Sequence, residues 1–214
     1  MRLPPARATI AICAITGLAF CAALLAGQLD RVAMLAGFIP ARFSDGLAVA
    51  GAAPAWLTPL SATLVHGGVW HVVFNLLMIA FCGRLVEASI GPVALVLLYV
   101  AGAYASAAAQ YAYMPHSADV MIGASGAGSA VIGAYALLYS PKRTTGWGPI
   151  SGQWLQVLWL AAAWVGLQAL LDIASAGVPG VPAGGAIATP AHVGGFLAGL
   201  VLARPLLLFR YRNA

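Results

Sequence analysis

The sequence predicts an all-α membrane protein, a bundle of six transmembrane helices whose N and C termini are both cytoplasmic. Composition, the spacing of apolar runs and the distribution of basic residues together predict this fold. Of the 214 residues, 62% are hydrophobic and only 7% are charged, a balance far from that of a soluble globular domain. The net charge of +5 comes from ten scattered basic residues, so no nucleic-acid partner is expected.

Six apolar runs approach the length of about 20 residues that a helix needs to cross a bilayer. They leave no room for a separate soluble domain, so residues 1–214 are expected to form a single membrane domain. The first run is long for a signal peptide, and bulky Phe20 precedes Cys21 where a lipoprotein signal needs a small residue. We therefore interpret it as a retained helix. The predicted helices cover residues 8–27, 68–86, 92–113, 122–140, 153–173 and 188–209.

The basic residues indicate the orientation of these helices, because cytoplasmic loops carry an excess of Lys and Arg. The two loop basic residues Arg31 and Arg42 fall on one side, and the other eight fall on the opposite, cytoplasmic side. The second, fourth and sixth helices would then all run from the outside inward. The eight cytoplasmic residues are Arg2, Arg7, Arg84, Lys142, Arg143, Arg204, Arg210 and Arg212.

Two outer segments differ from simple helix connectors. Residues 28–65 are too many for a short loop, so we expect them to fold partly into the membrane interface, with Trp56 as an anchor. Residues 177–190 are rich in Pro and Gly and cannot continue a helix. We expect this second segment to form a mobile cap.

Several polar side chains fall at membrane depth, where they are costly and mark candidate functional groups. His71 and Asn75 are four residues apart, so they share one face of the second helix, and His66 lies at its entrance. Ser125 and His192 lie near the starts of the fourth and sixth helices. Since these three helices run in the same direction, all five groups belong to the outer half of the membrane.

Small residues would allow two of these helices to approach closely. Gly195 and Gly199 follow His192 on one face of the sixth helix, and a matching face on the fourth is formed by Gly126, Ala130 and Gly133. Close packing would bring Ser125 within hydrogen-bonding reach of His192. A serine beside an imidazole base is the minimal activated nucleophile.

Each polar residue also has a structural interpretation. A serine in a Gly- and Ala-rich helix usually packs and bonds to its own backbone. Asn75 could join helices, His66 could brace the long loop, and His116 lies in a short outer turn. The three cysteines lie in apolar runs with no metal-site spacing, so we interpret them as packing residues. Only the constellation as a whole indicates chemistry.

This constellation resembles the rhomboid family of intramembrane serine proteases. The resemblance is carried by three motifs on the corresponding helices and in the family's order, and it spans about residues 56–203. The motifs are "HGGVWHVVFN" at residues 66–75, "GASG" at residues 123–126 and "AHVGGFLAG" at residues 191–199.

The resemblance implies a Ser–His dyad in which Ser125 is the nucleophile and His192 the base. It also implies that His71, Asn75 and the backbone N–H of Ser125 stabilise the oxyanion, and that Glu87 has a structural role. The chemistry it implies needs no metal and no cofactor. The expected partners are the lipid bilayer and single-pass membrane proteins with a helix-destabilised segment near the outer end. The expected location is the inner membrane of a bacterium.

Glycines are expected to support this site structurally. Gly123 and Gly126 would leave backbone room for the oxyanion and the substrate, while Gly195 and Gly199 would admit the neighbouring helix. Two other functions stay open at this stage. One is a catalytically inactive relative that binds membrane clients, and the other is a transporter or haem-binding bundle that uses the membrane histidines.

The sequence departs from the family pattern at two places. Rhomboids often have a large or aromatic residue four positions after the nucleophile, packed against the catalytic imidazole, whereas this chain has Ser129. The Ser129 hydroxyl could bond to His192 instead. The first loop has "AWLTPL" where many members carry a Trp-Arg pair, so its docking is expected to differ in detail.

Overall fold

The described residues, 6–139, 146–175 and 189–212, form an all-helical bundle in the computed structural model, with no β-strand among them. The prediction of an all-α protein is therefore confirmed. Six long helices lie at the six predicted runs, with ends that differ by a few residues. They are α1 (Arg7–Leu25), α5 (Val69–Ile90), α6 (Pro92–Tyr113), α7 (Ser125–Tyr139), α8 (Gly152–Ser175) and α9 (Thr189–Arg210).

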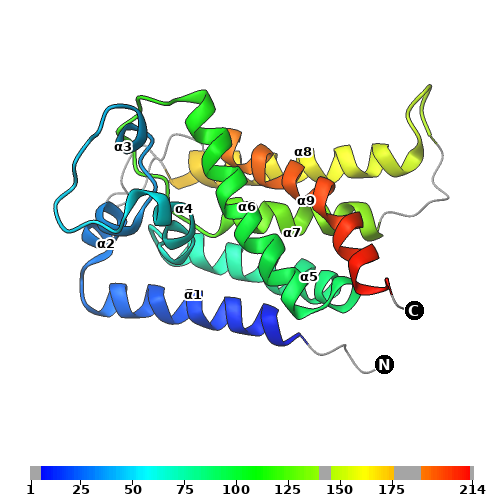
Figure 1. The fold of residues 1–214 in the computed structure, drawn as a ribbon, viewed down its shortest axis with the longest axis horizontal. Helices are drawn as coiled ribbons and strands as arrows, with labels where there is room; N and C mark the ends of the chain where they lie inside the picture. Colours follow the sequence, from blue (N-terminus) through cyan, green and yellow to red (C-terminus); the bar gives the residue numbers. More distant parts are fainter. Residues whose placement is uncertain (1–5, 140–145, 176–188, 213–214) are drawn as a thin grey trace.

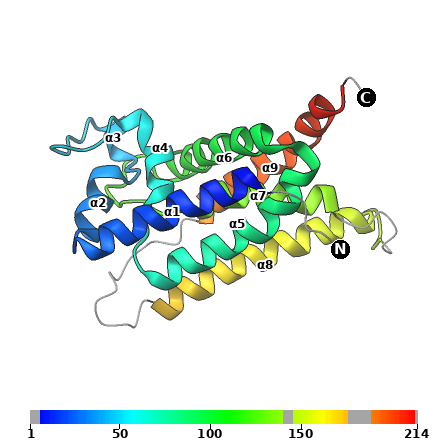
Figure 2. The ribbon, with the colours of Figure 1, turned by 90° about the horizontal axis from the view of Figure 1, so that it is seen from below.

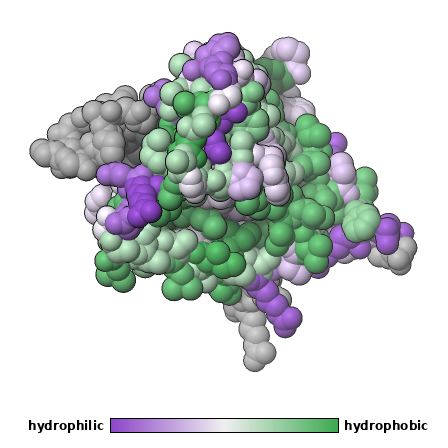
Figure 3. Space-filling model, turned by 60° about the vertical axis from the view of Figure 1, so that its left-hand side comes forward, coloured by the Kyte–Doolittle hydropathy of each residue, from purple (hydrophilic) through white to green (hydrophobic). Residues whose placement is uncertain are grey.

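Apolar surface identifies the chain as an integral, multi-pass membrane protein. Within the described part of the chain, α1, α5, α6 and α9 are each long and apolar enough to cross a membrane. Large side chains such as Leu18, Val93 and Val201 are each at least 70% exposed, which a water-soluble surface would rarely tolerate in such number. Hydrophobic residues cover large parts of the face shown in Figure 3. The six-span count and the cytoplasmic termini stay predictions.

Helix α7 lies at the centre of the bundle (Figure 1). Its 15 residues are mostly small or apolar, and all but Tyr135, Leu138 and Tyr139 are buried. Helices α5, α6, α8 and α9 all pack against it, and α1 packs outside, against α5 and α6. A helix that is apolar on every side can be covered by protein or by lipid, and in α7 neighbouring helices cover nearly every residue. Helix α7 is thus a core element rather than a lipid-facing one.

The long segment between α1 and α5 is folded, as expected, into short helices. These gather at one end of the bundle, opposite the end at which α1 begins and α9 ends (Figures 1 and 2). Trp56, the expected interfacial anchor, is 66% exposed. The short helices are α2 (Leu29–Ala36), α3 (Ala41–Ser44), the 3-10 helix η1 (Ala55–Leu57), α4 (Thr58–Ser61) and the 3-10 helix η2 (Ala62–Leu64).

Backbone hydrogen bonds tie this folded segment to the stretch that leads into α7. Phe38 and Met121 exchange N–H···O bonds of 2.9 and 2.8 Å, and the Ser44 hydroxyl donates to the Pro115 carbonyl at 2.6 Å. An irregular segment near a membrane needs such partners for its backbone groups. The predicted cap over residues 177–190 lies outside the described residues, apart from the first two residues of α9.

Glu87 joins α5 to the start of α1. Glu87 is 4% exposed, and its carboxylate accepts hydrogen bonds from the backbone N–H groups of Ala8 and Thr9 at 3.0 and 2.8 Å and from the Thr9 hydroxyl at 2.7 Å. The first N–H groups of a helix have no partner within the helix, and a negative charge there also interacts favourably with the helix dipole. Glu87 therefore caps α1 from a neighbouring helix, a structural role in agreement with the one the resemblance implies.

We predict that Glu87→Ala lowers the free energy of unfolding by about 2 kcal/mol, because two buried N–H groups lose their acceptor. Thermal unfolding of the detergent-purified protein should report this as a lower midpoint. Glu87→Gln keeps one acceptor oxygen and should fall between the parent and Glu87→Ala. An unchanged midpoint for Glu87→Ala would show that α1 does not depend on this cap.

Candidate active site

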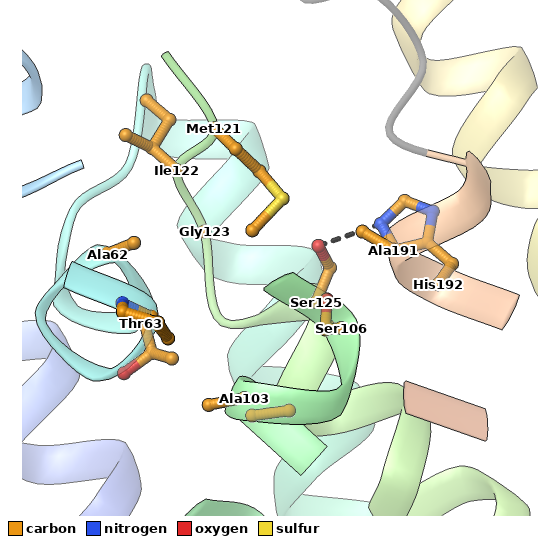
Figure 4. Close-up of a pocket in the computed structure, with 13 residues that line it drawn as sticks. Ala62, Thr63, Ala103, Ser106, Met121, Ile122, Gly123, Ser125, Ala191 and His192 are labelled. Carbon is orange, nitrogen blue, oxygen red and sulfur yellow. Dashed lines mark hydrogen bonds between the residues drawn. The ribbon is translucent and has the colours of Figure 1, made fainter. Parts of the chain in front are cut away.

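Ser125 and His192 lie together in the structure (Figure 4). Ser125 is the first residue of α7, and His192 lies in the first turn of α9. The distance between Ser125 Oγ and His192 Nε2 is 2.9 Å, and the two residues are 7% and 5% exposed. In the neutral tautomer with its proton on Nδ1, the imidazole accepts a hydrogen bond from the serine hydroxyl at Nε2. This is the arrangement of a nucleophile beside its base.

Backbone contact between α7 and α9 sets this distance. A side chain at Gly195 would collide with the carbonyl oxygen of Gly126, and one at Gly199 would collide with that of Ala130. In the other direction, a side chain at Gly133 would collide with the carbonyl oxygen of Phe196. Glycines from both helices thus remove the side chains that would otherwise hold the helices apart.

Gly126 was expected to leave room for an oxyanion and a substrate, but the structure shows another side chain in that space. The space where its side chain would point is filled by Ser106 of α6, whose Oγ and Cβ would both clash with an added methyl group. Gly126 therefore lets α6 as well as α9 approach the start of α7. The expected open space is absent on this side of Gly126 because a third helix packs there.

The turn before Ser125 is held from two sides. Gly123 has φ +114°, a value that side chains disfavour, and its N–H donates to the Ala62 carbonyl at 2.9 Å. The next N–H, of Ala124, donates to Nε2 of His66 at 3.2 Å. Burial and, to a smaller degree, neighbouring His71 lower the pKa of His66 to about 3, so its ring is neutral and Nε2 can accept. His66 thus stabilises the turn that precedes Ser125.

His71 lies against the same turn. A methyl group built on Gly123 would be 2.6 Å from His71 Nε2 and 3.7 Å from Ser125 Oγ, so both atoms border one small volume. Asn75 is buried one helical turn further along α5, and its amide donates to the His71 carbonyl at 2.9 Å. An amide nitrogen carries two hydrogens, so this bond leaves the second available for another acceptor.

Ser125 also contributes its backbone N–H. As the first residue of α7, it belongs to the turn whose N–H groups have no acceptor within the helix. The positive end of the helix dipole lies there too, which favours negative charge. Together with the His71 ring, these groups form surroundings suited to an oxygen anion next to Ser125.

A small cavity of about 20 Å³ adjoins the dyad (Figure 4). Its walls come from the α4–η2 segment, α6, the turn into α7, the first turn of α7 and the start of α9. Its polar or sulfur-bearing lining residues are Thr63, Ser106, Met121, Ser125 and His192. The volume is close to that occupied by one water-sized molecule.

Three buried residues of α6 and α8 that carry polar atoms were missed from the sequence. Ser106 and Gln110 are buried four residues apart on α6, and Trp164 is buried on α8. The criterion that selected His71 and Asn75, polar groups one turn apart at membrane depth, applies equally to the α6 pair. Trp164 was missed because an indole in an apolar run passes for packing, although its N–H needs an acceptor when buried.

Within the described part of the chain, no three His, Cys, Asp or Glu side chains lie close enough to hold a metal ion.

Comparison with known proteins identifies the family of this chain. The family model for the Rhomboid domain matches residues 53–209, well over half of the chain. The chain belongs to the rhomboid family. The resemblance noted in the sequence is thus confirmed, and the matched region includes every helix that contributes to the site. Residues before position 53 lie outside the match, so a single domain over residues 1–214 stays a prediction.

One similar rhomboid is "Rhomboid-like protein 11, chloroplastic" from Arabidopsis thaliana, which is 32% identical over 153 residues. The alignment covers 70% of this chain and 52% of that protein, so the chain spans about half the length of this relative. The relative is named as chloroplastic and gives no support to the bacterial inner membrane expected from the sequence. The individual roles of the site residues in this rhomboid stay predictions.

We predict that Gly195→Ala separates α7 from α9 and weakens both the fold and the dyad. The added methyl group would meet backbone, which cannot move aside as a flexible side chain would. The unfolding midpoint should fall, and labelling of Ser125 by a serine-directed fluorophosphonate should decrease.

Gly166→Ala is a matched control, because Gly166 also lies within a helix but has open space at the corresponding position. Alanine favours a helix over glycine by about 1 kcal/mol, so the control should unfold at the parent's midpoint or slightly above it. Equal midpoints for the two variants would contradict the role of the α7–α9 contact.

Proposed function

We propose that this rhomboid is an intramembrane serine endopeptidase that cleaves peptide bonds in or near transmembrane segments. The observation that carries the proposal is the 2.9 Å hydrogen bond between Ser125 Oγ and His192 Nε2. The two residues are 67 positions apart in sequence, and the backbone packing of their helices holds them together. A serine needed only for packing would more often bond to its own helix.

In the first half of the proposed reaction, Ser125 Oγ attacks the carbonyl carbon of the substrate peptide bond. His192 Nε2 accepts the hydroxyl proton as the new C–O bond forms, which leaves a tetrahedral intermediate with a negative oxygen. The imidazolium then donates that proton to the departing amine as the C–N bond breaks. The product is an acyl-enzyme on Ser125 and a released amine.

In the second half, His192 removes a proton from a water molecule that attacks the acyl carbonyl. Collapse of this second intermediate releases the carboxylic acid and returns the proton to Ser125. In both halves, the Ser125 N–H, the His71 ring and Asn75 would donate to the oxyanion. Donors fixed before the reaction are effective in a low-dielectric site, because they need no reorganisation as charge develops.

The substrates we propose are single-pass membrane proteins whose helix is easily unwound near its outer end. Ser125 and His192 are both more than nine-tenths buried, and a peptide bond inside a stable helix is shielded by its own turns. A local extended stretch with small residues would fit beside Gly123 and the dyad. The bilayer is the second partner, since it holds both substrate and enzyme.

An inactive relative that binds membrane clients is the competing function. It would have no need of a paired serine and histidine at the end of a buried helix, so the dyad favours the protease. The two functions predict opposite results in a cleavage assay.

We predict that Ser125→Ala and His192→Ala each reduce cleavage of a reporter transmembrane substrate by at least about 1,000-fold, because each removes half of the nucleophile and base pair. The assay uses purified protein in liposomes, with fluorophosphonate labelling as a second measurement. Labelling should be lost in Ser125→Ala.

His116→Ala is a matched control, because the His116 side chain is 75% exposed on an outer turn and bonds to Asp45. It should cleave at the parent's rate. Client binding by the parent without cleavage or labelling would instead favour the inactive relative, and labelling that persists in Ser125→Ala would mean another nucleophile.

We also predict that His71→Ala lowers kcat about 100-fold with a smaller change in KM, since a donor to the oxyanion acts mainly in the transition state. Steady-state kinetics on the reporter substrate measure both constants. A change confined to KM would assign His71 to substrate binding rather than to the oxyanion.

A further inference from the structure

Trp164 lies beside the dyad, although it belongs to a helix that carries none of the three rhomboid motifs. It is 5% exposed on the inner face of α8. Its ring centroid is 6.4 Å from that of His192, with an angle of 66° between the ring planes. This is an edge-to-face contact within the usual range of about 4.5–7 Å for aromatic pairs.

The indole is held in place by Ser129 of α7. Trp164 Nε1 donates to Ser129 Oγ at 2.7 Å, and the Ser129 hydroxyl donates in turn to the Ser125 carbonyl at 2.7 Å. Ser129 is fully buried. A chain of two hydrogen bonds therefore runs from the indole to the backbone of the nucleophile.

This chain overturns the expectation that Ser129 bonds to His192. The single hydroxyl proton of Ser129 goes to the Ser125 carbonyl, and its oxygen receives the indole N–H. An indole N–H can only donate, and a buried donor without an acceptor is costly. Ser129 satisfies this requirement and fixes the orientation of the ring.

We propose that Trp164 is a positioning residue for His192 and that Ser129 holds Trp164 in that position. The proposal rests on the proposed protease function. The indole, packed edge to face with the imidazole, restricts the rotation of the imidazole away from Ser125 Oγ. Many rhomboids place a large residue four positions after the nucleophile, and in this chain α8 supplies the aromatic ring while a small serine anchors it.

Positioning affects the rate of the chemical step more than the binding of the substrate. Misplacement of a catalytic group by about 1 Å can cost about 100-fold in rate. We therefore expect Trp164→Leu to lower kcat by about 10- to 100-fold, with KM changed by less than about threefold. Trp164→Phe keeps an aromatic ring beside His192 but loses the N–H, so its loss of kcat should be clearly smaller.

A matched control comes from the same helix. Trp159 is 68% exposed on α8, so Trp159→Leu removes the same ring without touching the dyad and should retain the parent's kcat. Thermal unfolding of each variant separates loss of function from loss of fold. If Trp164→Leu does not fold, the test uses Trp164→Phe instead. This variant lacks the N–H that donates to Ser129, and its kcat is compared with that of the parent.

A double-mutant cycle tests that bond. Ser129→Ala should lower kcat in the parent, because the indole loses its acceptor. The same change should have little effect in a Trp164→Phe background, where no N–H remains to be held. Equal effects of Ser129→Ala in the two backgrounds would refute the link between Ser129 and Trp164.

The outcomes also separate this proposal from the proposed function. A parent that neither cleaves the reporter nor reacts with fluorophosphonate fails as a protease, which also removes the basis for positioning. An active parent whose folded Trp164→Leu variant keeps kcat within about twofold would refute positioning alone. A drop in kcat for Trp164→Leu, with partial rescue by Trp164→Phe and an unaffected Trp159→Leu, would support it.

Discussion

Backbone contact between α7 and α9 is the constraint on which the rest of the structure depends. Gly195 and Gly199 lie directly against carbonyl oxygens of α7, and this approach places His192 within hydrogen-bonding distance of Ser125. Helices in a bilayer gain little from the hydrophobic effect between them, so van der Waals packing of small residues must hold them together. The surface that stabilises the bundle is thus the same surface that assembles the dyad.

Around this contact, the other helices fix the nucleophile from several directions. The folded segment before α5 holds the turn at Gly123 and Ala124 through Ala62 and His66. Helix α6 fills the space beside Gly126, and α8 brings Trp164 to the imidazole. Because Ser125 is the first residue of a buried helix, its backbone N–H has no acceptor within that helix. The proposed chemistry thus draws on polar groups that also satisfy each other within the fold.

Much of the site could be predicted because its residue types are costly in a membrane. Ser125, His192, His71 and Asn75 stand out as polar side chains in apolar runs, and the order of the motifs indicates which helices carry them. The hypothesis for Ser129 failed because a hydroxyl has several possible acceptors, and the sequence does not indicate which helix lies opposite. Trp164 was missed for the same reason, since its importance depends on what its N–H and ring edge meet.

The sequence by itself determined the membrane class, the positions of the six long helices and the identity of the candidate dyad, because hydrophobic length, glycine spacing and polar side chains are local properties of the chain. Only the tertiary structure decided which space each glycine opens, so that Gly126 admits Ser106 and Gly195 admits the α7 backbone. It also decided that the indole of Trp164 from α8, rather than the hydroxyl of Ser129, meets His192. These outcomes depend on helix rotation and depth, which follow from packing among several helices at once and leave no periodic pattern in any one of them.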